Sequence, residues 1–195
     1  MGHDFSGFRI SKKEINMKKQ FMILPLALIF CFMVGCQDKE AMAELEEFRA
    51  QAEIEEQNEA LYRGIIEEIN KGNSEYFNEF YSPDSLYYMV SNSPKPLTRE
   101  EYQGFVKAFF KAFPDLNFSI EELYTVGDRV IARLILRGTH KGVWRGAPAT
   151  GNKFVMSSTF IVRFENGKVV EEREDFDQLG FLQQLGWELR LKEEK

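Results

Sequence analysis

Two glutamates near the end of the chain have the residue type and spacing needed for proton transfer. Glu172 and Glu174 lie two apart in the segment 168–177, whose pattern predicts a β-strand. Side chains two apart on a strand share a face, so both carboxylates lie on the same face as Val170 and Phe176. If that face covers the core, burial raises the carboxylate pKa, which suits a general acid or base. We predict that Glu174 is this group; the alternative is that the acidic run is solvated.

A histidine and a serine on neighbouring predicted strands have the parity to reach the same interior. His140 shares the parity of Leu134, in the strand predicted over 129–138. Ser158 shares the parity of the large apolar residues in the strand predicted over 153–165. We predict that His140 assists catalysis and that Ser158 contacts a ligand. The alternative for His140 is an exposed turn residue.

Aromatic residues are numerous enough to frame an apolar pocket, since the chain holds 18 Phe and 7 Tyr. Many lie on a helix that begins with the capping-box pair Thr98 and Glu101 and ends before Pro114. The predicted ligand contacts, with Ser158, are Tyr81, Phe105, Phe109, Trp144 and Phe160. Such a stripe also suits an ordinary core, and Trp144 suits either a lid over the pocket or a plug at the end of a barrel.

The elements that must position these residues are helices first and antiparallel strands second. An amphipathic helix ends at Lys71-Gly72-Asn73, a short aromatic segment follows, and a turn is predicted at Ser82-Pro83-Asp84. The predicted strands cover 85–90, 117–123, 129–138, 153–165 and 168–177. The last two form a hairpin around Asn166-Gly167. This order predicts an α+β fold with helices on one face of a curved sheet.

The first 36 residues have the order of a bacterial lipoprotein signal. Lys18 and Lys19 precede the apolar run Phe21–Phe32, and Gly35 then precedes Cys36. We predict a lipidated Cys36 that anchors the protein to a bacterial membrane, in the cell envelope and facing away from the cytoplasm. The alternative is an uncleaved single-span anchor, although the run is shorter than the roughly 20 apolar residues that cross a bilayer.

This interpretation divides the chain into three parts. Residues 1–35 are a leader, with Met17 as an alternative start, residues 36–56 are a charged and partly helical stalk, and residues 57–190 are one domain. The leader holds five of the 25 Lys and Arg and two of the 31 Asp and Glu, which leaves 20 basic and 29 acidic groups. The formal net charge of the remainder is −9, which argues against nucleic acid as a partner.

Cysteine usage removes several classes of site from the domain. Cys31 lies in the leader and Cys36 is the predicted lipid attachment point, so no thiol remains. Disulfide, zinc-thiolate and cysteine-nucleophile chemistry are therefore not expected. We expect no metal and no cofactor, and a small apolar molecule as the partner of the pocket.

Several motifs in the right order resemble one known family across residues 56–186. They are Phe113-Pro114-Asp115-Leu116, Val126-Gly127-Asp128-Arg129-Val130, Arg137-Gly138-Thr139-His140-Lys141-Gly142, Ala147-Pro148-Ala149-Thr150-Gly151, Arg163-Phe164-Glu165-Asn166-Gly167-Lys168 and Leu179-Gly180-Phe181-Leu182-Gln183-Gln184-Leu185-Gly186. This set resembles the SnoaL-like polyketide cyclase family, often labelled ester cyclase, of the NTF2-like superfamily. The resemblance implies a cone-shaped half-barrel, with three N-terminal helices packed on a curved, mostly antiparallel sheet around an apolar cavity. It also implies a homodimer through the sheet.

The resemblance further implies ring closure by intramolecular aldol condensation, without metal or cofactor. In that family the acid/base is an acidic residue on the last long strand, usually an aspartate that follows a tryptophan. The matching positions here are Arg173 and Glu174, so the tryptophan is absent and the acid is longer by one methylene. The family histidine on the preceding strand falls near Thr159 or Phe160, where this chain has none.

Three functions follow from the sequence, and each predicts a different result. A cofactor-free cyclase or isomerase needs an enclosed pocket and loses activity in Glu174→Gln. A lipoprotein that binds an apolar ligand without turnover keeps its affinity in that variant. An interaction module has a cavity filled by its own side chains and does not respond to ligands.

Overall fold

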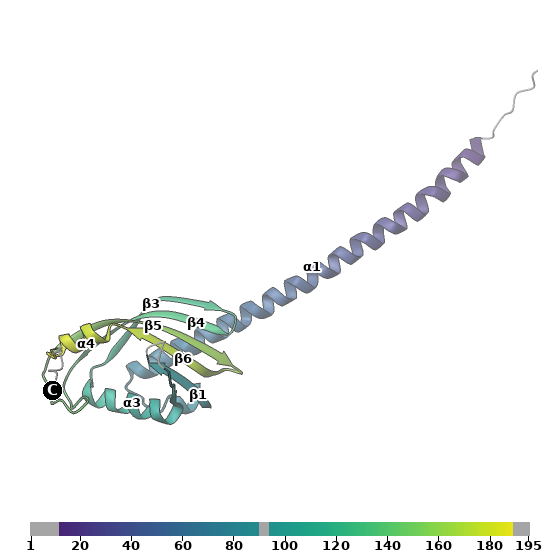
Figure 1. The fold of residues 1–195 in the computed structure, drawn as a ribbon. Coiled ribbons are helices and arrows are strands. Elements are labelled where there is room, and N and C mark those ends of the chain that lie inside the picture. Colours follow the sequence, from purple (N-terminus) through teal and green to yellow (C-terminus); the bar gives the residue numbers. More distant parts are fainter. Residues whose placement is uncertain (1–11, 90–93, 189–195) are drawn as a thin grey trace, which may run out of the picture. The chain divides into compact units, whose positions relative to one another are not determined.

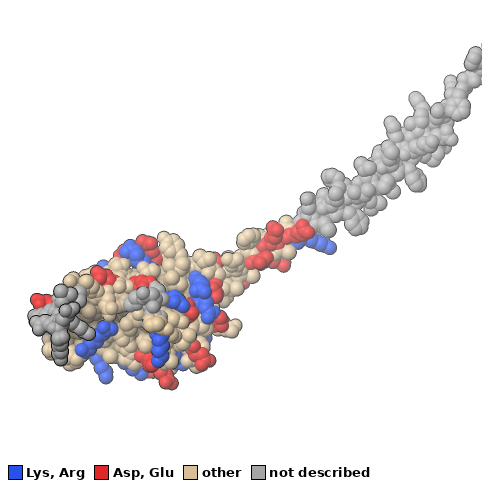
Figure 2. Space-filling model, viewed as in Figure 1, with Lys and Arg blue, Asp and Glu red and all other residues tan. Residues whose placement is uncertain are grey.

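The computed structural model describes residues 12–89 and 94–188, with side chains from residue 39 onward. The chain divides into two compact units, one ending at Ala50 and one beginning at Gln51. Figure 2 shows acidic side chains along the described end of the first unit. Cys36 and the predicted leader before it lie outside the residues with described side chains, so the lipid anchor stays a prediction. Where side chains are described, no helix is both long enough and apolar enough to cross a membrane.

Helix α1 (Lys12–Asn70) includes the predicted stalk as well as the predicted first helix of the domain. The two are continuous because no Gly or Pro interrupts residues 37–63, and Ala, Glu and Gln favour helix. The predicted apolar stripe is buried at Tyr62, Ile65, Ile66 and Ile69. The amide of Asn58 donates to the carbonyl of Gly127 at 3.2 Å. The amide of Asn70 donates to the carbonyl of Phe118 at 2.9 Å and accepts from its N–H at 2.7 Å, so side chains near both ends of the stripe hold α1 to the strands.

The second unit holds a six-stranded sheet in the order β2-β1-β6-β5-β4-β3 (Figure 1). Its strands are β1 (Tyr81–Met89), β2 (Leu97–Thr98), β3 (Asn117–Val126), β4 (Arg129–Thr139), β5 (Lys153–Glu165) and β6 (Lys168–Phe176). All neighbours are antiparallel except β1 and β6, which run parallel. The predicted α+β fold with a mostly antiparallel sheet is therefore confirmed.

Three further helices complete the unit: α2 (Phe77–Phe80), α3 (Arg99–Ala112) and α4 (Gln178–Gln184). Figure 1 shows the strands arching over α3. The predicted capping box is present, because the Glu101 N–H donates to the Thr98 hydroxyl and the Thr98 N–H donates to the Glu101 carboxylate. Helix α4 is an addition to the predicted elements, and the Asp177 carboxylate caps it by accepting from the Gly180 N–H at 2.8 Å.

The predicted inner faces of β4 and β5 are confirmed by burial. The buried set is Val130, Ala132, Leu134, Leu136, Phe154, Met156, Ser158, Phe160, Val162 and Phe164. On β6 the prediction for Val170 is wrong, because Val169 takes the inward position. Phe164 pairs with Val169, and the register then shifts so that Val170 is the extra residue of a bulge. Beyond it the parity holds, and Glu172 and Glu174 are both buried.

A second bulge replaces the predicted turn at Ser82-Pro83-Asp84. Strand β1 already begins at Tyr81, which pairs with Val169, and pairing resumes only at Leu86 with Glu171. Pro83 has no N–H to give to a sheet, and a bulge accommodates that deficit inside a strand. The irregular stretch brings both Tyr81 and the later Tyr87 into the interior.

Candidate functional site

An apolar pocket opens among α3, the inner face of the sheet and the segment after β4. Its empty volume, which includes the open solvent at its mouth, is about 690 Å³. Its walls include Phe105, Phe109, Trp144 and Phe160, four of the predicted ligand contacts. Apart from tyrosine hydroxyls and the Trp144 indole, the polar groups of the lining come from Glu174, Arg145 and Gln178. A mostly apolar pocket with a few polar groups is typical of a small-molecule site.

Glu174 is the carboxylate of this pocket. Its side chain is buried, and Oε1 accepts a hydrogen bond from the Ser158 hydroxyl at 2.7 Å. Oε2 accepts a hydrogen bond from the Tyr87 hydroxyl. Burial raises the pKa of Glu174 above its ordinary value, while these two hydrogen bonds oppose the rise. A carboxylate fixed by two donors and facing an apolar space has the properties of a general base.

Glu172 faces a smaller space behind the first. The empty volume of this inner cavity, open solvent included, is about 240 Å³, and the cavity shares the walls Tyr102 and Phe160 with the main pocket. The Glu172 carboxylate accepts from the Tyr102 hydroxyl at 3.1 Å and from the Tyr81 hydroxyl. Burial raises the pKa of Glu172 to about 7, and the neighbouring Glu174 charge adds to the rise, against the pull of the tyrosine hydrogen bonds.

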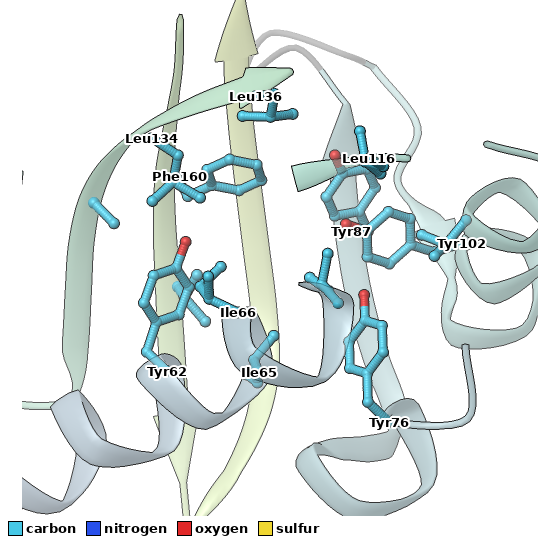
Figure 3. Close-up of a cluster of buried hydrophobic side chains, with 14 of the residues drawn as sticks. Tyr62, Ile65, Ile66, Tyr76, Tyr87, Tyr102, Leu116, Leu134, Leu136 and Phe160 are labelled. Carbon is cyan, nitrogen blue, oxygen red and sulfur yellow. The ribbon is translucent and has the colours of Figure 1, made fainter. Parts of the chain in front are cut away.

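Five buried tyrosines surround the two carboxylates: Tyr62, Tyr76, Tyr81, Tyr87 and Tyr102. Burial raises the pKa of each hydroxyl well above its ordinary value, so all five stay protonated at neutral pH. Figure 3 shows the rings of Tyr87 and Tyr102 lying against each other, with centroids 3.5 Å apart. Because Tyr102 contacts Glu172 and Tyr87 contacts Glu174, this stacked pair joins the two carboxylate sites.

Trp144 lies at the end of the pocket that Phe105 and Phe109 line, which we call the aromatic end. Its ring centroid is 5.4 Å from that of Phe105, 5.0 Å from that of Phe109 and 5.8 Å from that of Phe113. The indole Nε1 is buried and donates to no described residue. A buried donor without a partner costs about 1–3 kcal/mol. Trp144 is therefore a wall of the pocket, with one polar group left for something else to satisfy.

The segment with Trp144 is fixed against the end of α3. The backbone N–H groups of Lys141 and Gly142 both donate to the Ala112 carbonyl, at 2.8 and 3.0 Å. A Cβ on Gly142 would lie 2.2 Å from the Lys111 carbonyl oxygen, so only glycine allows this approach. The position of Trp144 is thus set by backbone contacts rather than by packing of its ring alone.

His140 lies apart from the carboxylates. It is fully buried, so the alternative of an exposed turn residue is wrong. Its Nδ1 lies 3.1 Å from the Thr150 hydroxyl and its ring stands 5.3 Å from Phe113, whereas the pocket lining does not include it. The Nε2 atom has no hydrogen-bond partner among the described residues. A catalytic role for His140 stays a prediction, and the position of the ring outside the pocket lining does not support it.

The structure thus brings most of the predicted site residues to one interior. Phe105, Phe109, Trp144, Phe160 and Glu174 line the main pocket, and Ser158 reaches it through its hydrogen bond to Glu174. Tyr81 instead belongs to the inner cavity with Glu172. Sequence reasoning selects Glu174 and leaves out Glu172, although their spacing of two already places both on one face. The tyrosine partners come from distant elements, which the sequence alone does not connect to the carboxylates.

A metal site is not evident among the described residues, where no three His, Cys, Asp or Glu side chains are grouped to hold an ion.

Residues 59–185 match the sequence model of the SnoaL-like polyketide cyclases. The chain belongs to this family. The aklanonic acid methyl ester cyclase DnrD of Streptomyces peucetius is 30% identical over 128 residues, which cover 65% of this chain and 88% of the relative. The nogalonic acid methyl ester cyclase of Streptomyces nogalater is also 30% identical over 128 residues, covering 63% and 92%.

Solved structures agree with the SnoaL-like fold. AclR of Streptomyces galilaeus, a candidate hydroxylase, is 25% identical with a TM-score of 0.63, covering 68% of this chain and 97% of AclR. IdmH of Streptomyces antibioticus, a candidate polyketide cyclase, is 28% identical with a TM-score of 0.58, covering 67% and 99%. These two similar proteins are described with different reactions, so function must be argued from the site.

Proposed function

We propose that the SnoaL-like domain binds a small hydrophobic carbonyl compound and catalyses its cyclisation or isomerisation with Glu174 as the acid/base. The observation that supports this best is a buried carboxylate, with a raised pKa, in the wall of an otherwise apolar pocket. Its two hydrogen bonds leave lone pairs on both oxygens, so it can still accept a proton. The two sequence relatives from Streptomyces are named as methyl ester cyclases, which supports the same class of reaction.

The chemistry needs one proton to leave and return. Glu174 takes a proton from the carbon beside a carbonyl, and the resulting enolate attacks a second carbonyl carbon of the same molecule. A new carbon–carbon bond forms, and Glu174 returns its proton to the alkoxide, so the reaction is a net isomerisation. In an isomerase the enolate forms no new carbon–carbon bond, and Glu174 returns the proton to another carbon of the same molecule. Ser158 and Tyr87 hold the carboxylate in position through both steps.

The test is turnover of aromatic di-carbonyl compounds by the wild type and by Glu174→Gln. General acid–base catalysis contributes about 10²–10⁴-fold, so we expect the variant to lose activity by that factor while it still binds the compound. Because burial raises the pKa of Glu174, the wild-type rate should rise with pH above the range where an ordinary glutamate ionises. Tyr87→Phe removes a donor to the carboxylate, so its pH profile should move further upward.

The alternative is a binding protein without turnover. The observation that favours this alternative is the aromatic lining of the main pocket, which suits an apolar ligand without any catalytic group. In that case Glu174→Gln keeps full affinity, and no product forms with the wild type at any pH. Ligand response with no chemistry across a broad set of carbonyl compounds would favour this function over the first.

We also propose that Cys36 is lipidated and holds the domain at a bacterial membrane, with the domain facing away from the cytoplasm. The support is the sequence pattern of Lys18, Lys19 and the apolar run that ends before Gly35-Cys36. The test is labelling of the expressed chain with a fatty acid, beside Cys36→Ser. Loss of label in the variant supports the anchor, and an unlabelled wild type contradicts it.

A further inference from the structure

A residue in the aromatic wall of the pocket carries a hydrogen-bond donor that no described residue uses. The Trp144 indole N–H is buried, Trp144 lines the pocket, and no described residue accepts its proton. An indole N–H can only donate, so its partner must bring an acceptor oxygen or nitrogen. The rings packed around it, those of Phe105, Phe109 and Phe113, offer none.

A cation lies over the face of the same indole ring. The Arg145 guanidinium carbon lies 5.6 Å from the centre of the Trp144 ring, and Arg145 also lines the pocket. Its side chain makes no ion pair with the described residues, and it is exposed, which places its charge where the pocket meets solvent. An arginine offers several N–H donors in one plane, a geometry that matches a carboxylate.

The backbone conformation of Arg145 is one that arginine rarely adopts, which also indicates a functional role for its side chain. Trp144 and Ala147 exchange backbone hydrogen bonds at 3.0 and 2.9 Å, which closes a two-residue turn over Arg145 and Gly146. Both turn residues have positive φ, 48° for Arg145 and 82° for Gly146. Gly, Asn or Asp suits the first position of such a turn better than Arg does. The turn geometry therefore does not explain the arginine, whereas a positive charge placed over the Trp144 ring at the pocket for a ligand does.

This end of the pocket is separated from the acid/base. Trp144 packs on Phe109, whereas Glu174 bonds the Tyr87 that stacks on Tyr102. Positions 102 and 109 are seven residues apart on α3, which is about 10 Å at 1.5 Å per residue. A ligand that lies along α3 can therefore hold a negative group at Trp144 and Arg145 and its reacting carbon near Glu174, without bringing the two negative charges together.

We propose that Trp144 and Arg145 bind a carboxylate of the ligand, so that this pocket takes a free hydrophobic acid. The proposal rests on the proposed function only in that the pocket binds a small apolar carbonyl compound. Two relatives are named for methyl esters, and a methyl ester carries no charge to pair with an arginine. The specific claim is that this chain distinguishes an acid from its ester at the pocket mouth.

The experiment compares anthraquinone-2-carboxylate with its methyl ester, which have the same apolar body. Dissociation constants for the full chain are measured by calorimetry at low and high salt. We expect the wild type to bind the acid about tenfold more tightly, the size of one charge-assisted hydrogen bond, and to lose that margin as salt rises. Arg145→Gln should bring the ratio of acid to ester affinity close to one with little change for the ester. Trp144→Phe keeps the aromatic wall without the N–H, and should weaken the acid.

Two controls keep the result specific. Arg129→Gln removes an exposed arginine at the far turn of the sheet, outside the pocket lining, and should leave the ratio unchanged. If Arg145→Gln unfolds, Arg145→Gly removes the same charge while relieving the positive φ. Equal affinities for acid and ester, an unchanged ratio in the Arg145 variants, or no binding of either probe each overturn the proposal. An acid preference without turnover leaves it standing and contradicts only the catalytic part of the proposed function.

Discussion

The two ends of the interior are built from different chemistry on the same helix. Around Tyr102, in the first half of α3, buried hydroxyls donate to Glu172 and Glu174. Around Phe109, in the second half, rings pack on rings, and the Trp144 indole N–H nearby has no partner among the described residues. The first, polar end holds the buried carboxylates, which cost stability when they are charged. The second, aromatic end stabilises the fold by apolar packing. Substitutions at the aromatic end should therefore lower the free energy of unfolding, whereas substitutions at the polar end should change how that free energy depends on pH.

The largest loss of stability is expected from Phe113→Ala at the aromatic end. Phe113 is fully buried and its ring contacts those of Phe109, Phe154 and Phe181. Truncating a buried phenylalanine costs about 3–5 kcal/mol. Urea denaturation of both proteins measures the change in the free energy of unfolding. Phe105→Ala is the matched control, since that ring is only half-buried, and an equal loss there contradicts the assignment of packing energy to the Phe113 cluster.

At the polar end, the buried Glu172 should make the free energy of unfolding depend on pH. The folded-state pKa of Glu172 is about 7, above its ordinary value of 4.5, so the folded state binds more protons between these values. Stability from this group is therefore full below pH 4.5 and is lost as the pH rises through 7, by up to about 3 kcal/mol. Glu172→Gln has no charge to bury and should flatten the curve.

Glu171→Gln is the control for this measurement, because Glu171 lies on the other face of β6 and pairs with Arg173 at 2.9 Å. Unfolding free energies from pH 5 to 8 are compared for the three proteins. A wild-type curve that stays level, or one that Glu171→Gln flattens equally, means that Glu172 is not the source of the effect. Glu174, whose pKa is also raised, is expected to leave a smaller residual slope in Glu172→Gln.

A substitution at Gly142 tests how the Trp144 segment is held at the aromatic end. The new methyl group of Gly142→Ala would meet the Lys111 carbonyl oxygen at 2.2 Å, so the backbone must move. Overpacking of this kind costs about 1–3 kcal/mol. Thermal unfolding gives the loss, and the shift of tryptophan fluorescence reports the indole environment. Gly104→Ala has open space around its new methyl and should instead stabilise α3 by about 0.5–1 kcal/mol.

The fold could be predicted from the sequence because local signals and the period of apolar residues agree. The capping box of Thr98 and Glu101 and the turn at Asn166-Gly167, where φ is 51° and 72°, appear where their residue types require them. Alternation on β4 and β5 gave the correct buried face at every predicted position. The error at Val170 arose because a bulge adds one residue without a sequence mark, and the register before it changes face.

The site was less accessible to the same reasoning. Parity places Glu174 and Ser158 inside, but the partners of the carboxylates come from α3 and from β1, a strand whose first residues have the sequence pattern of a turn. Contacts between elements far apart in the chain depend on the sheet order, in which β6 lies between β1 and β5. The parallel pairing of β1 with β6 has no short-range signal, so the tyrosine cluster could be found only in the structure.

The smallest effect is expected where α3 begins, next to the polar end. Thr98 caps the helix and also pairs with Leu86 of β1, one residue before the Tyr87 that holds Glu174. Thr98→Ala removes the hydroxyl acceptor and should cost about 1 kcal/mol, whereas Thr98→Ser keeps an oxygen there and should cost less. Amide hydrogen exchange can localise the change, because fraying begins at the uncapped end. Faster exchange in the first turn of α3, with the turn before Phe113 unchanged, would show that the two ends are stabilised separately; equal acceleration along the helix would mean that they open as one unit.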